Sequence, residues 1–149
     1  MAVLRDDPYP ALGFLVVIAG VFDDGQSFRG SFSEVSGLEV SIQSIEYRTG
    51  SEDITVRKLP GLKKFSNIVL KRGVIGDLSF WTWIKSVIDG QVQRVDGTIT
   101  LLDEKRQPVL QWKFRRGWPC RWTGPTLQAN GHEVAIETLE ICHEGLELE

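Results

Sequence analysis

The amino-acid sequence predicts a mainly β protein, a small antiparallel β-barrel or β-sandwich with one flanking α-helix. Short apolar stretches alternate with turn residues along most of the chain, and only one segment has helical apolar spacing. Several predicted strands carry apolar side chains on both faces. One helix cannot cover all of these faces, so we expect a partner subunit to cover some of them.

The first predicted strand covers residues 14–19 and is followed by a turn at Asp23-Asp24-Gly25. A second strand is expected over residues 28–35. The apolar residues from 38 to 47 then alternate and shift phase once, which predicts one long strand with a bulge at Gln43 and Ser44.

Residues 48–64 are interpreted as a long loop. They contain Gly50, Pro60 and Gly61, many charged side chains and no sustained apolar period. Loops of more than about 12 residues are uncommon in compact domains and usually have a function. An ordinary solvated loop remains the alternative.

A strand at residues 67–71 precedes the predicted helix, which covers residues 77–89. Asp77 is its expected N-cap and Gly90 its stop signal. Its apolar side chains recur at helical spacing and should pack on the sheet. They are Leu78, Trp81, Ile84, Val87 and Ile88.

The rest of the chain is predicted to be β structure. A hairpin joins residues 98–102 to residues 109–115 through a turn at 103–108. The last strand covers residues 133–143 and is apolar on both faces.

The composition indicates one globular domain over residues 1–149. Apolar residues make up 42% of the 149 residues and charged residues 25%, which are ordinary values. Two cysteines are too few for a disulfide scaffold, and the absence of a basic, then apolar leader predicts synthesis in the cytoplasm without a signal peptide. The apolar stretch near the start is far shorter than the roughly 20 residues that span a bilayer, so we expect no membrane insertion by the monomer.

No motif for catalysis is found. The nucleophile elbow, the phosphate-binding glycine loop and the zinc-protease helix signature are all missing. His132, His143, Cys120 and Cys142 form the one conceivable set of soft metal ligands, but Cys142 and His143 are neighbours on a predicted strand and should point to opposite faces. We therefore expect no catalytic residue, metal or cofactor.

The charge pattern argues against a nucleic-acid-binding protein. The net charge is -3, whereas phosphate binding needs a concentrated basic surface. Basic and aromatic residues alternate between residues 112 and 122, where bases could stack. A half-buried strand shows the same alternation, and we favour that interpretation.

Several segments, taken in order, resemble the tail-tube family of contractile phages and extracellular contractile injection systems. A strand beginning Phe14-Leu15-Val16 and a helix containing Trp81, Trp83 and Ile84 are part of the resemblance. The other segments are Arg5-Asp6-Asp7-Pro8-Tyr9-Pro10, Phe32-Ser33-Glu34-Val35-Ser36-Gly37-Leu38, Ile45-Glu46-Tyr47-Arg48, Arg57-Lys58-Leu59-Pro60-Gly61, Ile68-Val69-Leu70-Lys71-Arg72-Gly73, Trp118-Pro119 and the closing residues 133–146.

The resemblance implies a structural role with no chemistry. Six copies would form a ring, and rings would stack into a hollow tube inside a contractile sheath, as part of a virion tail or injection particle. The implied partners are the sheath, the baseplate, spike and initiator proteins, and a tape measure or protein cargo in the lumen. A tube-initiator or baseplate-hub ring subunit, a type VI effector carrier and a small β-barrel enzyme or ligand-binding module are the alternatives.

The resemblance also implies which residues make contacts between subunits or rings. Residues 48–64 would reach a neighbouring ring, with Pro60 and Gly61 fixing the path and the lysines pairing with acidic residues of that ring. Gly37 would relieve backbone strain in a turn, and a wholly structural role for that turn is the alternative. The implied contact residues are Ser36, Gly37, Leu38, Tyr47, Arg48, Arg57, Lys58, Leu59, Pro60, Gly61, Lys63 and Lys64.

Overall fold

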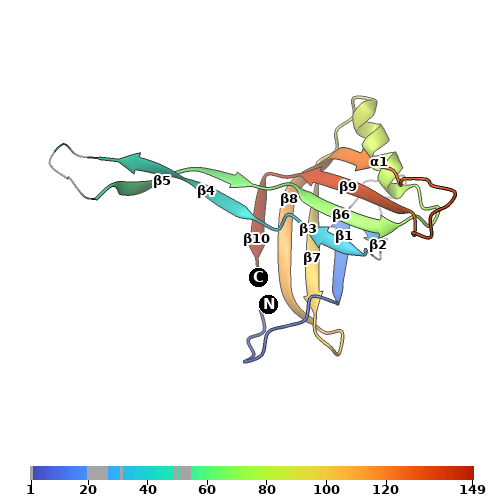
Figure 1. Ribbon diagram of the computed structural model, residues 1–149, viewed down its shortest axis with the longest axis horizontal. Coiled ribbons are helices and arrows are strands. Elements are labelled where there is room, and N and C mark those ends of the chain that lie inside the picture. Colours follow the sequence, from blue (N-terminus) through green and yellow to red (C-terminus); the bar gives the residue numbers. More distant parts are fainter. Residues whose placement is uncertain (1, 20–26, 31, 49, 51–54) are drawn as a thin grey trace.

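The computed structural model describes residues 2–19, 27–30, 32–48, 50 and 55–149 (Figure 1). These residues form ten strands and one helix. The strands are β1 (Phe14–Ala19), β2 (Ser27–Gly30), β3 (Glu34–Ser36), β4 (Val40–Tyr47), β5 (Arg57–Phe65), β6 (Ile68–Gly73), β7 (Val95–Leu102), β8 (Pro108–Thr123), β9 (Ile136–Cys142) and β10 (Gly145–Leu148), and the helix is α1 (Ser79–Ile88).

The body is one antiparallel sheet that folds over on itself. The strand order is β2-β1-β7-β8-β9-β6-β3, and β10 also pairs with β8. Strand β8 has 16 residues, so its first part pairs with β7 and β10 while its last part pairs with β9. In Figure 1 strands β1 and β7 run across the direction of β6 and β9. We call β2, β1, β7, the first part of β8 and β10 the first half-sheet.

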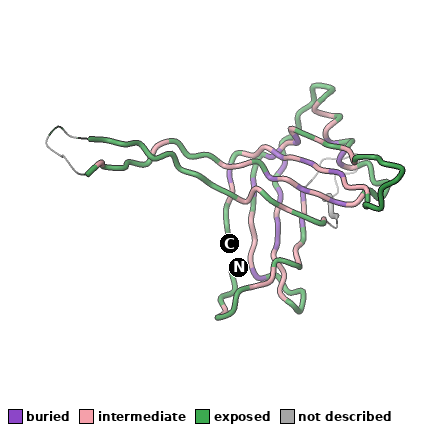
Figure 2. Tube along the Cα trace, viewed as in Figure 1, coloured by how far each residue is buried: buried purple, intermediate pink, exposed green. Residues whose placement is uncertain are grey.

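The core lies between the two halves of the sheet. Alternate residues of β1, β6, β7 and β9 point into it, as the period of two requires. The buried residues of the first half-sheet face those of β6 and β9, and Figure 2 shows this buried layer in the body alone. They include Val16, Ile18, Ile99 and Phe114 on one side and Ile68, Leu70, Leu139 and Ile141 on the other. The predicted mainly β sandwich with one flanking helix is confirmed.

Helix α1 adds Phe80 and Trp83 to this core. Phe80 stacks on Phe32 with ring centroids 5.7 Å apart. The apolar stripe predicted from the sequence was wrong, because Leu78 and Ile88 are exposed. The helix buries Phe80 and Trp83, which lie three positions apart and were not part of the predicted stripe.

The predicted helix start at Asp77 is close to the observed one. Leu78 takes the N-cap position, but the Asp77 carboxylate accepts hydrogen bonds from the backbone N–H of Ser79 (3.0 Å) and from its hydroxyl (2.6 Å). The hydroxyl bond contributes most to a lowered pKa of Asp77. Asp77 therefore stabilises the first turn as an ionised acceptor.

The single strand predicted over residues 28–35 was wrong, because two separate strands occupy this part of the chain. It is divided into β2, which pairs with β1, and β3, which pairs with β6. The predicted turn at residues 23–25 lies outside the described residues. The last predicted strand begins at Ile136, three residues later than expected, and β10 was not predicted because four residues carry little periodic signal.

The long loop predicted at residues 48–64 was also wrong. Residues 57–65 form β5, which pairs with β4 in a two-stranded ribbon that projects from the body (Figure 1). The predicted bulge is confirmed by a register shift between Ile42 and Ser44. Strand β5 was not predicted because it contains Pro60 and three lysines, and proline and lysine are depleted in strands in general. Proline is tolerated here because β5 is an edge strand.

Replacing Gly37 by alanine should destabilise the fold by about 2–4 kcal/mol. Gly37 has a φ of 86°, and a Cβ there would lie 2.0 Å from the backbone oxygen of Asn67. Gly76→Ala is the matched control, since Gly76 has a φ of 83° but open space around its missing Cβ. Thermal unfolding should show a clearly larger loss for Gly37→Ala. Equal losses would mean that the neighbouring backbone yields to the new methyl group.

Candidate assembly surface

The β4–β5 ribbon exposes a set of large apolar side chains. Each is between 48% and 78% exposed, although the ribbon is regular β structure. They are Val40, Ile42, Ile45, Tyr47, Leu59 and Leu62. An isolated two-stranded ribbon is marginally stable in water. A group of exposed apolar side chains on such a ribbon is typical of a contact site. The exposed apolar side chains make the ribbon a candidate contact surface.

The ribbon is also basic. Strand β5 carries Arg57, Lys58, Lys63 and Lys64 and has no carboxylate, whereas β4 contributes Glu46 as its one charged residue. These side chains are exposed. The surface that covers the ribbon should therefore be partly acidic.

Most of the predicted contact residues lie together on this ribbon. Tyr47 and Arg48 lie at its outer end, and the members from Arg57 to Lys64 lie along β5. Ser36, Gly37 and Leu38 lie instead at the base, where β3 ends before β4 begins. The positive φ of Gly37 gives it a structural role.

The register shift creates a hollow on the ribbon. Gly61 lies opposite the shift, and a Cβ there would be 2.9 Å from the Ile45 side chain and 3.0 Å from the Gln43 carbonyl oxygen. Only glycine fits this crossing without displacement. The hollow has a volume of about 440 Å³ and is lined by Ser41, Ile42, Gln43, Leu62, Lys63 and Lys64.

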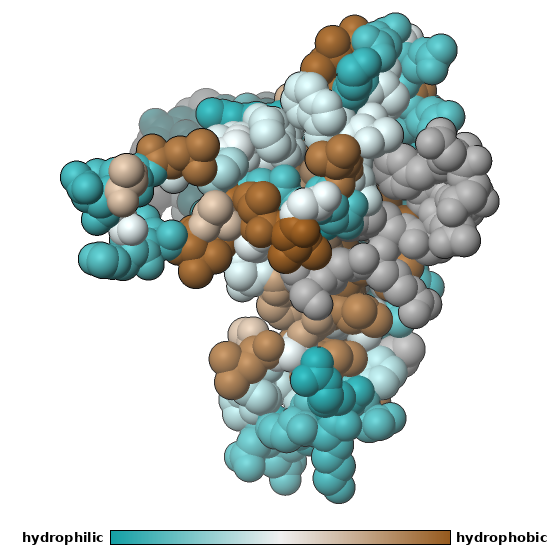
Figure 3. All heavy atoms as spheres, turned by 90° about the vertical axis from the view of Figure 1, so that its right-hand side faces the viewer, coloured by the Kyte–Doolittle hydropathy of each residue, from teal (hydrophilic) through white to brown (hydrophobic). Residues whose placement is uncertain are grey.

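A second apolar surface surrounds the start of α1, and sequence reasoning missed it. We call it the α1-side surface. Its side chains are between 41% and 84% exposed, and Figure 3, which faces this side of the molecule, shows hydrophobic atoms gathered there. They are Val74, Ile75, Leu78, Trp81, Leu127 and Val134. The Val74 N–H donates to the Ala135 carbonyl (2.9 Å), and Trp81 packs edge-on against Trp122, which joins these segments into one surface.

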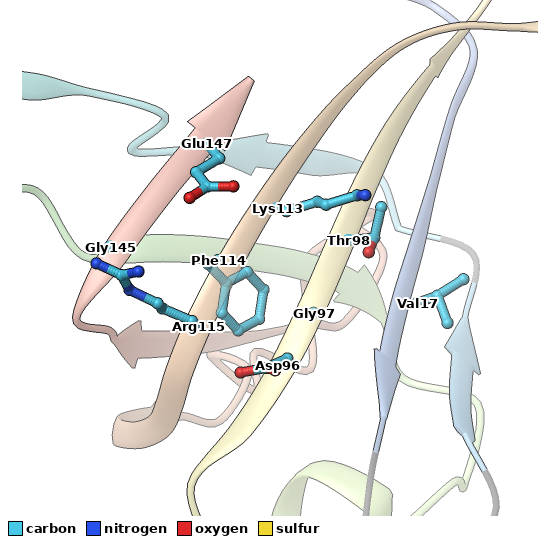
Figure 4. A pocket seen from close by; sticks show the side chains of 9 residues that line it. All are labelled: Val17, Asp96, Gly97, Thr98, Lys113, Phe114, Arg115, Gly145 and Glu147. Carbon is cyan, nitrogen blue, oxygen red and sulfur yellow. The ribbon is translucent and has the colours of Figure 1, made fainter. Parts of the chain in front are cut away.

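The outer face of the first half-sheet is polar instead. The strand register aligns Val17, Thr98, Lys113 and Glu147 in one row across four strands. An open groove of about 330 Å³ follows this row, with Asp96 and Arg115 beside it (Figure 4). Lys113 pairs with Glu149 (2.9 Å), and this cation lowers the pKa of the Glu149 carboxyl. Cations and carboxylates are therefore interspersed on this face.

The basic and aromatic stretch at residues 112–122 is a half-buried strand, as favoured from the sequence. Phe114 is buried in the core, and Trp112 packs against that core. Lys113 and Arg115 are exposed on the opposite face. The alternation thus follows from the strand period.

The described residues contain no group of three or more His, Cys, Asp or Glu side chains able to hold a metal ion. Cys120 and Cys142 are free thiols on neighbouring strands. Burial, assisted by the Cys142 thiol, raises the pKa of Cys120 to about 12. A thiol with such a pKa is a poor nucleophile at neutral pH. No helix in the described part of the chain is long and apolar enough to cross a membrane.

The described residues thus form a small β-sandwich with a projecting ribbon and two exposed apolar surfaces. The sequence matches the profile of the T4-like virus tail tube protein gp19 over residues 10–147. The chain belongs to this tail tube family. The resemblance found in the sequence is therefore confirmed, and the family role is that of a structural tube protein.

Solved structures agree with this assignment. A chain of the anti-feeding prophage baseplate is 26% identical, with a TM-score of 0.88 over 97% of both chains. A chain of the PVC sheath-tube complex, an extracellular contractile injection system, is 28% identical, with a TM-score of 0.82 over 95% of this chain and 91% of that chain. Hcp1 from Flavobacterium johnsoniae is 14% identical, with a TM-score of 0.55 over 91% of this chain and 93% of that chain, and shares the fold. No curated protein sequence matches significantly.

Proposed function

We propose that this chain builds the inner tube of a contractile phage tail or phage-tail-like injection system as stacked rings of six copies. The observation that carries the proposal is that the apolar ribbon projects from one side of the body, whereas α1, which the second apolar surface surrounds, lies on the other side (Figure 1). One molecule cannot bring them together. A head-to-tail contact between copies covers both, and such a contact closes into a ring when its rotation allows.

The similar structures support the ring size and the partners. The anti-feeding prophage baseplate is described with 6-fold symmetry, and the PVC chain comes from a sheath-tube complex. By analogy, this chain would contact a sheath on its outside, initiator and baseplate proteins at one end, and a tape measure or protein cargo inside. Its role would be mechanical, without catalysis.

The sheet edges fit the same contact. Among the described residues β10 pairs with β8 alone and β2 with β1 alone, and these two strands form the opposite edges of the first half-sheet. Figure 1 shows β10 on the side of the ribbon and β2 on the side of α1. Open edges are hazards unless another chain covers them, and a ring of copies would cover both.

The polar face of the first half-sheet is the proposed lumen wall. Its row of Val17, Thr98, Lys113 and Glu147 carries one cation and one carboxylate. A charge-balanced wall holds neither acidic nor basic cargo strongly. The ribbon would contact neighbouring copies in the same ring or in the next one.

Electron microscopy of the purified protein over a concentration series tests the proposal. We expect rings at low concentration and stacked six-fold tubes at high concentration. Single rings that never stack would favour an initiator subunit, a role suggested by the similarity to a baseplate chain. A protein that stays monomeric even with its sheath and baseplate partners would contradict the tube proposal.

A further inference from the structure

We infer that the base of the β4–β5 ribbon binds the α1-side surface of a second copy in the same ring. The ribbon hollow with Ile42 and Leu62 would receive apolar side chains of the α1-side surface, such as Leu78 or Leu127. This inference rests on the proposed function and names the surface of the neighbouring copy, its α1-side surface, that the ribbon contacts.

The first argument is that both surfaces need cover of the same kind. Leu62 is 78% exposed beside the ribbon hollow, and Leu127 is 84% exposed on the α1-side surface. Both belong to groups of six large apolar residues, larger than the scattered apolar residues of an ordinary monomer surface. Each group therefore offers the other an apolar partner of similar extent.

The second argument is charge. The hollow is flanked by Lys63 and Lys64. The segments that form the α1-side surface, residues 74–92 and 124–135, carry the carboxylates Asp77, Asp89 and Glu133 and the cation Lys85. Asp77 pairs with Arg72 at 3.3 Å and Asp89 with Lys85 at 3.4 Å, so Glu133 is the carboxylate best placed to meet a lysine of the ribbon. A lysine of the ribbon against Glu133 would help to fix the orientation of the contact.

The same charges disfavour the simplest alternative, a two-fold contact between two ribbons. Such a contact would bring the four cations of one β5 strand against the same four of its partner. Like charges placed together at an interface oppose binding. A head-to-tail contact avoids this repulsion.

The third argument is continuity along the sheet. The ribbon lies on the β10 side of the body, and α1 lies on the β2 side (Figure 1). A neighbour that brings its β2 edge toward the β10 edge also brings its α1-side surface toward the ribbon. One lateral contact therefore covers the ribbon, the α1-side surface and both edges.

Cysteine cross-linking tests the assignment. In a Cys120→Ser/Cys142→Ser background, Leu62→Cys is combined in turn with Leu78→Cys, Leu127→Cys or Val134→Cys, and assembled rings are treated with oxidised glutathione. We expect at least one pair to give a ladder of linked species up to the hexamer on a non-reducing gel. The control pair combines Leu62→Cys with Leu4→Cys, which is 98% exposed on the N-terminal segment, and should stay monomeric.

The outcomes separate the inference from the proposed function. Rings that form normally while all three pairs stay unlinked, or link no more than the control, would overturn the receptor and leave the tube role standing. Chains that form no rings in the parent background would instead refute the tube role.

A charge exchange gives a second readout that needs no cysteine. Lys63→Glu/Lys64→Glu should raise the concentration needed for ring formation at least tenfold. Adding Glu133→Lys to the same chain should restore part of the loss. A loss without any recovery, with unchanged thermal unfolding, would speak against the α1-side receptor.

Discussion

Replacing Arg72 by methionine should remove about 3–5 kcal/mol of the stability of the monomer, a large part of the roughly 5–15 kcal/mol typical of a domain. The Arg72 side chain is 2% exposed, and its Nε donates to Glu137 Oε1 at 2.5 Å. Its guanidinium also reaches Asp77, through the carboxylate (3.3 Å) and the carbonyl oxygen (3.1 Å), and lies 4.0 Å over the Phe80 ring. One side chain therefore joins β6 to β9 and to the start of α1.

The loss arises mainly from the partner that remains. Without Arg72, Glu137 keeps a buried carboxylate that still accepts a hydrogen bond from Trp122 Nε1 at 3.4 Å but has lost its cation. An unpaired charge in the interior costs far more than the pair itself contributes. Arg72→Met/Glu137→Leu should thus recover much of the loss.

Chemical denaturation of Arg72→Met, Arg72→Met/Glu137→Leu and a control variant measures the free energy of unfolding that each has lost. Lys71→Ala is the control, because Lys71 neighbours Arg72 but pairs with Glu34 (3.2 Å) at the surface, where a pair is worth at most about 1 kcal/mol. If the single and the double variant lost the same free energy, the buried charge would not be the cause.

The sequence predicted the parts of the fold in which one strand face is buried. The bounds of β1 were predicted as observed, whereas β7 begins three residues earlier and β8 ends eight residues later than predicted. The face of α1 was mispredicted for a physical reason. Leu78 and Ile88 are apolar but remain exposed in the monomer, and a helical pattern cannot separate a core face from one exposed in the single chain.

The structure of the predicted contact region was described wrongly. Residues 48–64 were singled out by their length and charge, and most of the predicted contact residues do lie on the ribbon. Strand β5 was missed because neither of its faces packs on the body, so nothing imposes an alternating pattern. The α1-side surface was missed because Leu127 and Val134 are distant from α1 in the sequence, and only the fold joins Ala135, the neighbour of Val134, to Val74 before α1.

Introducing two aspartates into the ribbon, Ile42→Asp/Leu62→Asp, should abolish rings and tubes without changing the melting temperature of the monomer. Both side chains are exposed and lie apart from the buried core. In an assembled ring each would lose about 1.5 kcal/mol or more of burial, and a combined loss near 3 kcal/mol weakens each contact about 100-fold. The same loss recurs at every contact of a ring, so assembly should fail completely.

Leu4→Asp is the matched control for this loss of assembly. Leu4 is exposed as well, but it lies on the N-terminal segment and not on the ribbon. Electron microscopy and sedimentation should show tubes for Leu4→Asp and monomers for the double variant. Scanning fluorimetry below the concentration needed for assembly, where both variants are monomers, should give both the same melting temperature, because the substituted side chains lie outside the core. Tubes formed by the double variant at the concentration of the parent protein would show that the apolar ribbon is dispensable, and the burial of β4 and β5 by a neighbour would have to be abandoned.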